Sequence, residues 1–307
     1  MRYVFLYLLI FITSQSFASP VKNGFDLENS IIPIDEILSG GPPRDGIPSI
    51  DTPKFIDADK AHFLKSDDRV IGVDYNGVAR AYPIRILNWH EIVNDKIAGE
   101  AVAITFCPLC GTGIVYSGDI EGKPHQFGVS GLLYNSDVLL YDRETETLWS
   151  QILSKGVSGK LVGSNLDIIP SSHTSWQSWR SSHPKTQVLS TDTGLSRDYN
   201  RSPYGDYTKN SSTYFPVAFK SKRYHPKERV MGITLDGKHK AYPFSELAKV
   251  GGTILEDDFL GQQLVIEFDA ENRDGVIKNK TGAILPSVNS FWFAWYAFHP
   301  KAEVFSK

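Results

Sequence analysis

The sequence has very little cysteine and almost no excess charge. Two cysteines in 307 residues rule out the dense disulfide frameworks that hold small secreted domains together. A chain of this length buries about three quarters of its unfolded surface and folds without disulfides, so the two cysteines are free to serve a chemical purpose. The formal net charge is −3, and the basic residues are scattered. Without a concentrated basic surface we expect no nucleic-acid partner, and no other partner is indicated.

Long apolar runs are also missing after the first twenty residues. At the N-terminus, Arg2 precedes an apolar run over 4–12, and the segment 16–18, Ser-Phe-Ala, has the small residues of a cleavage site. This layout is typical of a secretory signal peptide over residues 1–18, and the apolar run is too short for a convincing membrane span. We therefore expect an exported protein, periplasmic or secreted, with no membrane span after the signal is removed.

Two stretches of the chain recur in the same order. Residues 68–106 resemble residues 228–268, and residues 175–190 resemble residues 291–306. Two copies in one order predict an internal duplication rather than a solenoid, because solenoids need more repeats. The shared positions are turn glycines, an Ala-Tyr-Pro segment and helix tryptophans, among them the pairs Gly72 and Gly232, Gly77 and Gly237, Tyr82 and Tyr242, Trp176 and Trp292, and Trp179 and Trp295.

Each copy predicts a similar set of elements. Asn76-Gly77 between alternating apolar residues is a strong hairpin signal, and Pro83 then begins a short helix over 84–93. Short strands follow closely on one another, and the tryptophan-rich segments predict short helices that end at His-Pro. We expect an α+β fold with mainly antiparallel sheets, built from two related β-rich halves with short helices.

The chain is expected to divide into five parts. These are the signal peptide (1–18), an N-terminal extension (19–60), a first half with the cysteine site (61–194), a long connecting loop (195–227) and a second, degenerate half (228–307). The loop is rich in Ser, Tyr, Asn and Pro, and long ordered loops often serve as functional lids. Because the second half has Asp269 and Asn272 where the first has its cysteines, residues unique to the first half are the better candidates for chemistry.

Both cysteines lie in one short motif, Thr-Phe-Cys-Pro-Leu-Cys-Gly-Thr-Gly, over residues 105–113. A catalytic Cys-x-x-Cys pair usually begins a helix, whose dipole lowers the pKa of the first thiol. Here a predicted strand leads into Cys107, and a second strand follows Cys110 after Gly111 and Gly113. A tight turn that points both sulfurs to one side is typical of a metal knuckle, although such knuckles normally come in pairs. Any metal therefore needs ligands from elsewhere in the chain.

His90 is the first candidate for a third metal ligand. It lies in the predicted helix before the cysteine strand, among apolar residues that should bury it. Together with Cys107 and Cys110 it would form a Cys2His site for copper or zinc, with copper slightly ahead. Glu91 and His125 are candidates for a fourth ligand or for a supporting hydrogen bond. The alternative is that His90 is a core histidine bonded to the backbone.

A second polar group follows in the segment 139–151. Its residues Asp142, Arg143 and Glu144, with Glu146 nearby, could carry out acid–base work as paired carboxylates. A charged hairpin turn flanked by strands is the favoured interpretation.

Three long motifs resemble, in the same order, those of a large prokaryotic family known as a domain of unknown function. They lie at 104–113, 127–151 and 226–247, and an Asn-Trp-His-Glu-Ile-Val-Asn-Asp helix motif adds to them. The resemblance runs from about residue 40 to the C-terminus. It implies an exported protein in which His90, Cys107, Cys110 and Asp142-Arg143-Glu144 are signature positions, and it implies no particular activity.

Three functions stay open at this point. The first is an exported metal-binding protein that carries copper or zinc or uses the metal in redox chemistry. The second is a thiol–disulfide oxidoreductase in which Cys107 attacks and Cys110 resolves, which would make these two residues catalytic. The third is a non-catalytic β-rich binding scaffold with a structural cysteine pair. Whether the protein is an enzyme is left undecided by the sequence.

Overall fold

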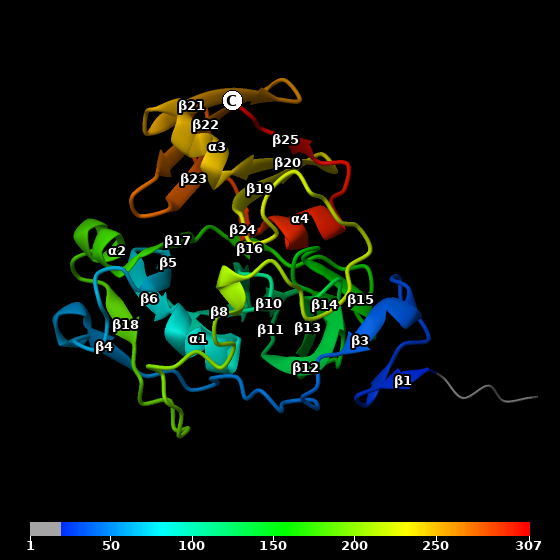
Figure 1. The fold of residues 1–307 in the computed structure, drawn as a ribbon. Coiled ribbons are helices and arrows are strands. Elements are labelled where there is room, and N and C mark those ends of the chain that lie inside the picture. The colour runs from blue at the N-terminus through cyan, green and yellow to red at the C-terminus, as the bar shows by residue number, and fades with distance from the viewer. Residues whose placement is uncertain (1–19) are drawn as a thin grey trace, which may run out of the picture.

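The structure is a computed structural model that describes residues 20–307. The signal peptide predicted over 1–18 lies outside these residues. The described chain is mainly β, most strand pairs are antiparallel, and the helices are few and short, as the sequence predicted (Figure 1). No helix within residues 20–307 combines the length and apolar character needed to cross a membrane.

The central sheet has eight strands and joins segments from both ends of the chain. Its order is β25 (Glu303–Val304), β20 (Lys238–Pro243), β19 (Arg229–Leu235), β24 (Val288–Phe291), β9 (Thr112–Ser117), β8 (Glu100–Cys107) and β7 (Ile92–Ile97), with β16 (Ile168–Ile169) beside β9. The contact between β24 and β9 connects the two predicted halves through the pair Asn289 and Gly113.

Smaller sheets surround the central one (Figure 1). One contains β17 (Ser172–Ser175), β5 (Arg69–Tyr75), β6 (Val78–Pro83), β18 (Gln187–Leu189) and β4 (Phe55–Asp57). A second contains β15 (Lys155–Ser158), β14 (Leu148–Ser150), β13 (Asp137–Asp142), β12 (Phe127–Tyr134) and β3 (Ile37–Ser39). A third contains β21 (Ile254–Phe259), β22 (Gln262–Asp269) and β23 (Asp274–Asn279). Two short hairpins join β1 (Val21–Lys22) to β2 (Phe25–Asp26) and β10 (Asp119–Ile120) to β11 (Lys123–Pro124).

Turn chemistry explains the first hairpin and the end of the first helix. Asn76 and Gly77 both have positive φ, 52° and 78°, which is the type I′ geometry that fits a two-residue hairpin, as predicted. Helix α1 (Ile84–His90) begins after Pro83, but its predicted end at residue 93 is wrong. Glu91 has a φ of 58° and stops the helix, and the β-branched residues after it pair with β8 as strand β7.

The hairpins β5–β6 and β19–β20 have matching neighbours. An antiparallel strand followed by a tryptophan helix borders each: β17 with α2 (Trp176–Ser182), and β24 with α4 (Trp292–Phe298). A parallel strand borders the other side of each, β18 and β25. A short helix follows each hairpin, α1 in one case and α3 (Phe244–Leu247) in the other. The indole rings of Trp179 and Trp295 lie where a β-carbon on Gly72 or Gly232 would be.

The main hydrophobic core contains both cysteines. It gathers residues of β9, β12, β13 and β14 from the first half together with β24 and α4 from the second half. Cys107 and Cys110 pack in it with side chains such as Trp149, Phe291 and Trp292. The sulfur atoms are therefore shielded by both halves of the chain, and the environment of the site is apolar.

Candidate metal centre

The two cysteines lie on a tight turn between strands, as predicted. Strand β8 ends at Cys107 and strand β9 begins at Thr112, so the turn consists of residues 108–111. Gly111 has a φ of 58°, and a β-carbon there would lie 2.7 Å from the ring of Phe291, so glycine is the residue that fits. The N–H of Phe291 donates to the carbonyl of Cys110 at 2.8 Å, which ties the turn to β24.

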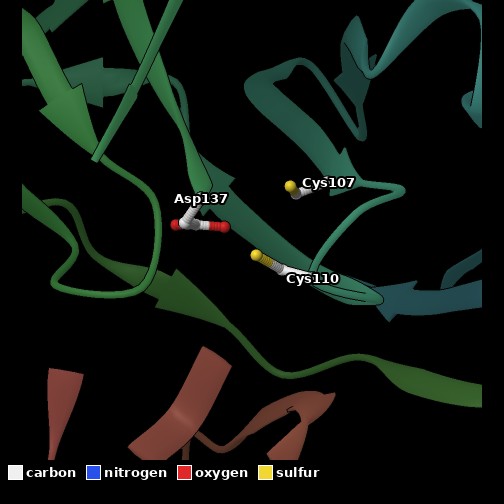
Figure 2. Close-up of side chains that lie close together, drawn as sticks. All are labelled: Cys107, Cys110 and Asp137. Atoms are coloured by element: carbon white, nitrogen blue, oxygen red, sulfur yellow. The ribbon is translucent and has the colours of Figure 1, made fainter. Parts of the chain in front are cut away.

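A second turn brings Asp137 to the sulfur atoms. Strands β12 and β13 are joined by Asn135 and Ser136, whose positive φ values of 51° and 68° are typical of a two-residue hairpin turn. Asp137 is the first residue of β13, and its carboxylate points at both thiols (Figure 2). The two Sγ atoms and one Asp137 oxygen all lie within 4.8 Å of one another. The sequence offered no signal for this contact, because the turn and the knuckle are separate in the chain.

The hydrogen bonds of the cluster leave one acceptor unused. The Oδ2 atom of Asp137 accepts from the N–H of Ile152 at 3.1 Å. Its buried Oδ1 atom has no hydrogen-bond partner in the described chain. The carbonyl of Ser136 also faces the sulfurs, 3.2 Å from Sγ of Cys110 and 3.9 Å from Sγ of Cys107. Buried oxygen atoms that converge beside two sulfurs need a proton or a cation among them.

Burial favours the protonated forms of the acidic groups in this cluster. Cys107 is 2% exposed and Cys110 is 0% exposed. Burial raises the pKa of the Cys107 thiol and raises that of Cys110 well above its ordinary value. Burial also raises the pKa of Asp137 to about 7 and that of Glu91 to about 7. Ionising two thiols and a carboxylate here requires a positive charge between them, because a buried anion without a partner is costly.

The loop 195–227 covers this cluster. Tyr204 donates its hydroxyl hydrogen to Oε1 of Glu91 at 3.0 Å, and the N–H of Ala218 donates to Oδ1 of Asn135 at 2.8 Å. The ammonium of Lys227 lies 3.6 Å from the centre of the Tyr207 ring and bonds the carbonyl of Ser212 at 2.6 Å. Burial lowers the pKa of Lys227 to about 8, while a Cys110 thiolate would raise it. The loop thus supplies a buried positive charge near the sulfurs.

His90, the predicted third ligand, is engaged elsewhere. Its Nδ1 lies 2.8 Å from the carbonyl of Pro48, and its Nε2 lies 2.7 Å from the hydroxyl of Tyr199. Burial lowers the pKa of the ring. Among the residues that the structure describes, the group of ligand atoms around the two sulfurs contains Asp137 and not His90. The chain reverses its path directly after His90, and it is Glu91 that faces the site.

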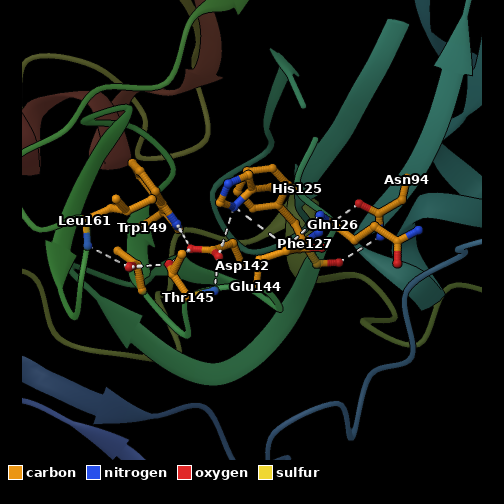
Figure 3. Close-up of polar contacts among 10 residues, drawn as sticks. Asn94, His125, Gln126, Phe127, Asp142, Glu144, Thr145, Trp149 and Leu161 are labelled. Carbon is orange, nitrogen blue, oxygen red and sulfur yellow. Dashed lines mark hydrogen bonds and ion pairs between the residues drawn. The ribbon is translucent and has the colours of Figure 1, made fainter. Parts of the chain in front are cut away.

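His125 lies in a different cluster, with Asp142 and Glu144 (Figure 3). Its Nδ1 is 3.1 Å from Oδ1 of Asp142 and 3.7 Å from Oε2 of Glu144. Asp142 also accepts from the N–H and hydroxyl of Thr145, both at 2.7 Å, and from Nε1 of Trp149 at 2.9 Å. Both oxygens are therefore satisfied, and the carboxylate holds the turn between β13 and β14. This is the charged turn that the sequence favoured over acid–base work.

Arg143 connects that turn to the N-terminal extension. Its Nη2 atom lies 2.9 Å from the hydroxyl of Ser49, 3.3 Å from Oδ2 of Asp51 and 3.5 Å from Oδ1 of Asp45. Oε2 of Glu144 accepts from the N–H of Gln126 at 3.0 Å. The three Arg143 contacts fix the position of residues 45–51 against the sheet that carries Asp137.

One family model matches the chain. It is described as "Protein of unknown function (DUF3179)", and the match covers residues 44–283. No curated protein and no solved structure matches. The matched range includes the cysteine turn, Asp137, Glu91 and the covering loop, so the whole cluster lies within the part that the family shares.

Proposed function

The chain belongs to the DUF3179 family of proteins of unknown function, and from this premise we propose that it is an exported protein that binds one transition-metal ion between Cys107, Cys110 and Asp137. The observation that supports the proposal most strongly is the convergence of two sulfurs and a carboxylate oxygen within 4.8 Å. The unpartnered Oδ1 of Asp137 adds to it, because a metal would satisfy that buried atom.

The ligand set favours zinc over copper. Zinc accepts thiolate sulfur at about 2.3 Å and carboxylate oxygen at about 2.0–2.2 Å, whereas copper(I) prefers soft ligands alone. A Cys2His site would favour copper slightly over zinc, whereas a Cys2Asp site favours zinc over copper. Two thiolates and one carboxylate around a divalent ion leave one negative charge, and the ammonium of Lys227 offsets it.

The supporting groups suit a closed site. Three protein ligands leave a fourth position for Glu91 or for a water molecule. Glu91 accepts a hydrogen bond from Tyr204 of the loop 195–227, so this loop and the site are linked directly. We infer that the loop acts as a lid that has to move when the metal enters or leaves, which would suit a protein that carries or stores the ion.

The environment of the thiols argues against disulfide exchange. An attacking cysteine needs a lowered pKa and access for its partner. Both thiols here are buried, and burial raises the pKa of each. The Cys-x-x-Cys turn also lies between strands and not at a helix N-terminus, so no helix dipole stabilises a thiolate.

Elemental analysis of the full chain tests the proposal. The protein is exported to the periplasm of an expression host and purified without chelators or affinity metals, beside three variants. We expect about one zinc per chain in the parent and in His90→Gln, and less than a tenth of that in Cys107→Ser and Asp137→Ala. Circular dichroism confirms that each variant is folded.

The variants also separate the two ligand sets. Loss of metal from His90→Gln with retention in Asp137→Ala would favour the Cys2His site over the Cys2Asp site. Equal metal content in the parent and in Cys107→Ser would reject metal binding at the cysteine turn altogether.

We also infer that the two β-rich halves arose by internal duplication. The matching neighbours of β5–β6 and β19–β20 support this, and so do the paired glycines under Trp179 and Trp295. At the position of the cysteine turn, the second half has a turn in which Asp269 accepts from the N–H and the side-chain amide of Asn272. The turn in the second half is thus closed by local hydrogen bonds, and its Asp269 and Asn272 occupy the positions that Cys107 and Cys110 have in the first half.

A further inference from the structure

A cleft of about 690 Å³ lies between the two halves, beside the cysteine turn. The first half contributes the start of β5, part of α1 and the turn residues Pro108 and Gly111. The second half contributes the start of β19, α3 and the turn after β22, and the loop over 202–209 forms a further wall. Four phenylalanines make much of the apolar lining: Phe106, Phe244, Phe268 and Phe291. A cleft of this size fits a small organic molecule.

The charges that line the cleft are almost all positive. They are Arg69, Arg229, Arg273, Lys209 and Lys227, against a single carboxylate, Glu228. Oε1 of Glu228 accepts from the N–H of Ser245 at 2.8 Å, and Lys209 is paired with Asp206 at 2.7 Å. The arginine ion pairs found within residues 20–307 belong to other arginines, namely Arg44, Arg80, Arg85 and Arg143. None of the three cleft arginines therefore has a carboxylate oxygen at ion-pair distance in this part of the chain, although the charge of Asp274 acts on Arg69.

The three arginines differ in how they are held. Arg69 donates to the carbonyls of His173, Asn272 and Arg273, so its guanidinium is fixed by the backbone. The guanidinium of Arg229 makes no hydrogen bond or ion pair among the described residues, and the residue is only partly exposed. Burial, with the charges of Arg69 and Arg273, lowers the pKa of Arg229 well below its ordinary value. Like charges that gather in a poorly solvated place repel one another, and an anion would relieve the repulsion.

We propose that this cleft binds a small organic anion, with its oxyanion group held by Arg229 and Arg273 and its apolar body against the phenylalanines. A guanidinium presents a planar fork of donors that matches the oxygens of a phosphate, sulfonate or carboxylate. Arg69 adds a third positive charge in a fixed position. The phenylalanine walls exclude a bare inorganic ion as the best ligand, because it would leave them in contact with water.

This inference does not rest on the metal site. The cleft adjoins the cysteine turn through Pro108, Gly111 and Lys227, but the arginines come from β5, β19 and the turn at 270–273. None of them contacts Cys107, Cys110 or Asp137 through a hydrogen bond or ion pair in the described residues. A metal-free protein should therefore still bind the anion, and this separates the two proposals experimentally.

Calorimetric titration of the full chain with defined probes tests the proposal. The probes are phenyl phosphate, benzoate, inorganic phosphate and the neutral compound phenol, at low salt. We expect phenyl phosphate or benzoate to bind at least tenfold more tightly than inorganic phosphate or phenol. Whichever of the two binds more tightly identifies the head group. Saturable binding of neither one by the parent would overturn the proposal.

Three variants locate the binding site. Arg273 is exposed, so Arg273→Gln should fold normally and weaken binding about fivefold to tenfold. Arg229→Gln should weaken binding at least tenfold. Arg180→Gln, an exposed arginine on α2, is the matched control and should bind like the parent. Unchanged affinity in both Arg229→Gln and Arg273→Gln would show that the anion binds elsewhere and would overturn the assignment.

A second measurement separates a binding role of Arg229 from a structural one. If Arg229 serves to bind an anion, its guanidinium is repelled by Arg69 and Arg273 in the ligand-free protein, and Arg229→Gln removes this repulsion. The melting temperature of the ligand-free protein should then rise, while added phenyl phosphate should raise it less than in the parent. A lower melting temperature of ligand-free Arg229→Gln, together with an undiminished shift by phenyl phosphate, would indicate a purely structural arginine.

Discussion

Replacing Gly111 by alanine should damage the cysteine turn through two separate effects. The first is conformational, because the φ of 58° is unfavourable for a residue with a β-carbon and costs about 1–2 kcal/mol. The second is steric, because the added carbon would lie 2.7, 2.8 and 2.9 Å from three ring atoms of Phe291. Ordinary carbon–carbon contacts are about 3.5–4.0 Å, so the ring would have to retreat by almost 1 Å.

The Phe291 ring has little room to retreat. It is 5% exposed, it belongs to the main core, and its backbone N–H is bonded to the carbonyl of Cys110. Overpacking of this kind costs about 1–3 kcal/mol. Together with the backbone effect, we expect Gly111→Ala to lower the free energy of unfolding by about 2–5 kcal/mol, and to lower metal content because both sulfurs depend on the turn.

Two control glycines separate these effects. Gly237 has a φ of 72° and nothing within 4 Å of an added β-carbon, so Gly237→Ala should show the backbone cost alone. Gly252 has an ordinary φ and equally open space, so Gly252→Ala should be close to neutral. Urea unfolding of the three variants measures the differences. If Gly111→Ala were no less stable than Gly237→Ala, the packing of Phe291 on the cysteine turn would be refuted.

Three further changes have defined outcomes. Burial and the neighbouring His239 lower the pKa of His299 to about 3. The unfolded histidine has a pKa of about 6.5, so the contribution of neutral His299 to stability is complete above that pH. This contribution is lost as the pH falls from about 6.5 to 3, by at most about 1.4 kcal/mol per pH unit. Urea unfolding at several pH values should show a shallower acid slope in His299→Gln, and an unchanged slope would contradict this. Asp142→Asn replaces a carboxylate oxygen that accepts several buried hydrogen bonds, so it should cost about 2 kcal/mol or more in urea unfolding while metal content stays at the parent level; loss of metal would instead tie this turn to the site. Gly72→Ala and Gly232→Ala should each lower the melting temperature, by amounts equal within error, because each places a β-carbon in the indole ring of its own tryptophan; a large difference would speak against equivalent packing in the two halves.

The turns and helix ends that the sequence predicts correctly are those determined by residues close together in the chain. Asn76-Gly77 set a type I′ turn, and Pro and Gly around the cysteines set the turn between β8 and β9. The tryptophan helices end near His183 and His299, where prolines follow. In each case the residues that determine the geometry lie within a few positions of one another.

The third side chain of the site could not be read in the same way. Helix α1 ends because Glu91 adopts a positive φ, and a glutamate gives no sequence signal for that conformation. The sequence therefore predicts a helix that continues to residue 93 and places His90 beside the sulfurs, and the structure corrects both. Asp137 approaches them from another sheet, and the register between two sheets depends on packing across the whole core. A carboxylate at a strand end is too common for the sequence to single it out.

If both proposals hold, Lys227 lies between two sites of opposite charge preference. The proposed metal site gathers acidic groups whose protonated forms are favoured by burial, and the proposed anion site gathers basic residues. The ammonium of Lys227 lines the cleft and also interacts favourably with a Cys110 thiolate. A divalent metal held by two thiolates and a carboxylate would give the cluster a net negative charge, which would offset part of the positive charge that Lys227 presents to the cleft. Metal binding should for this reason weaken anion binding slightly rather than strengthen it, and the reciprocity of linked equilibria requires the anion to weaken metal binding by the same factor.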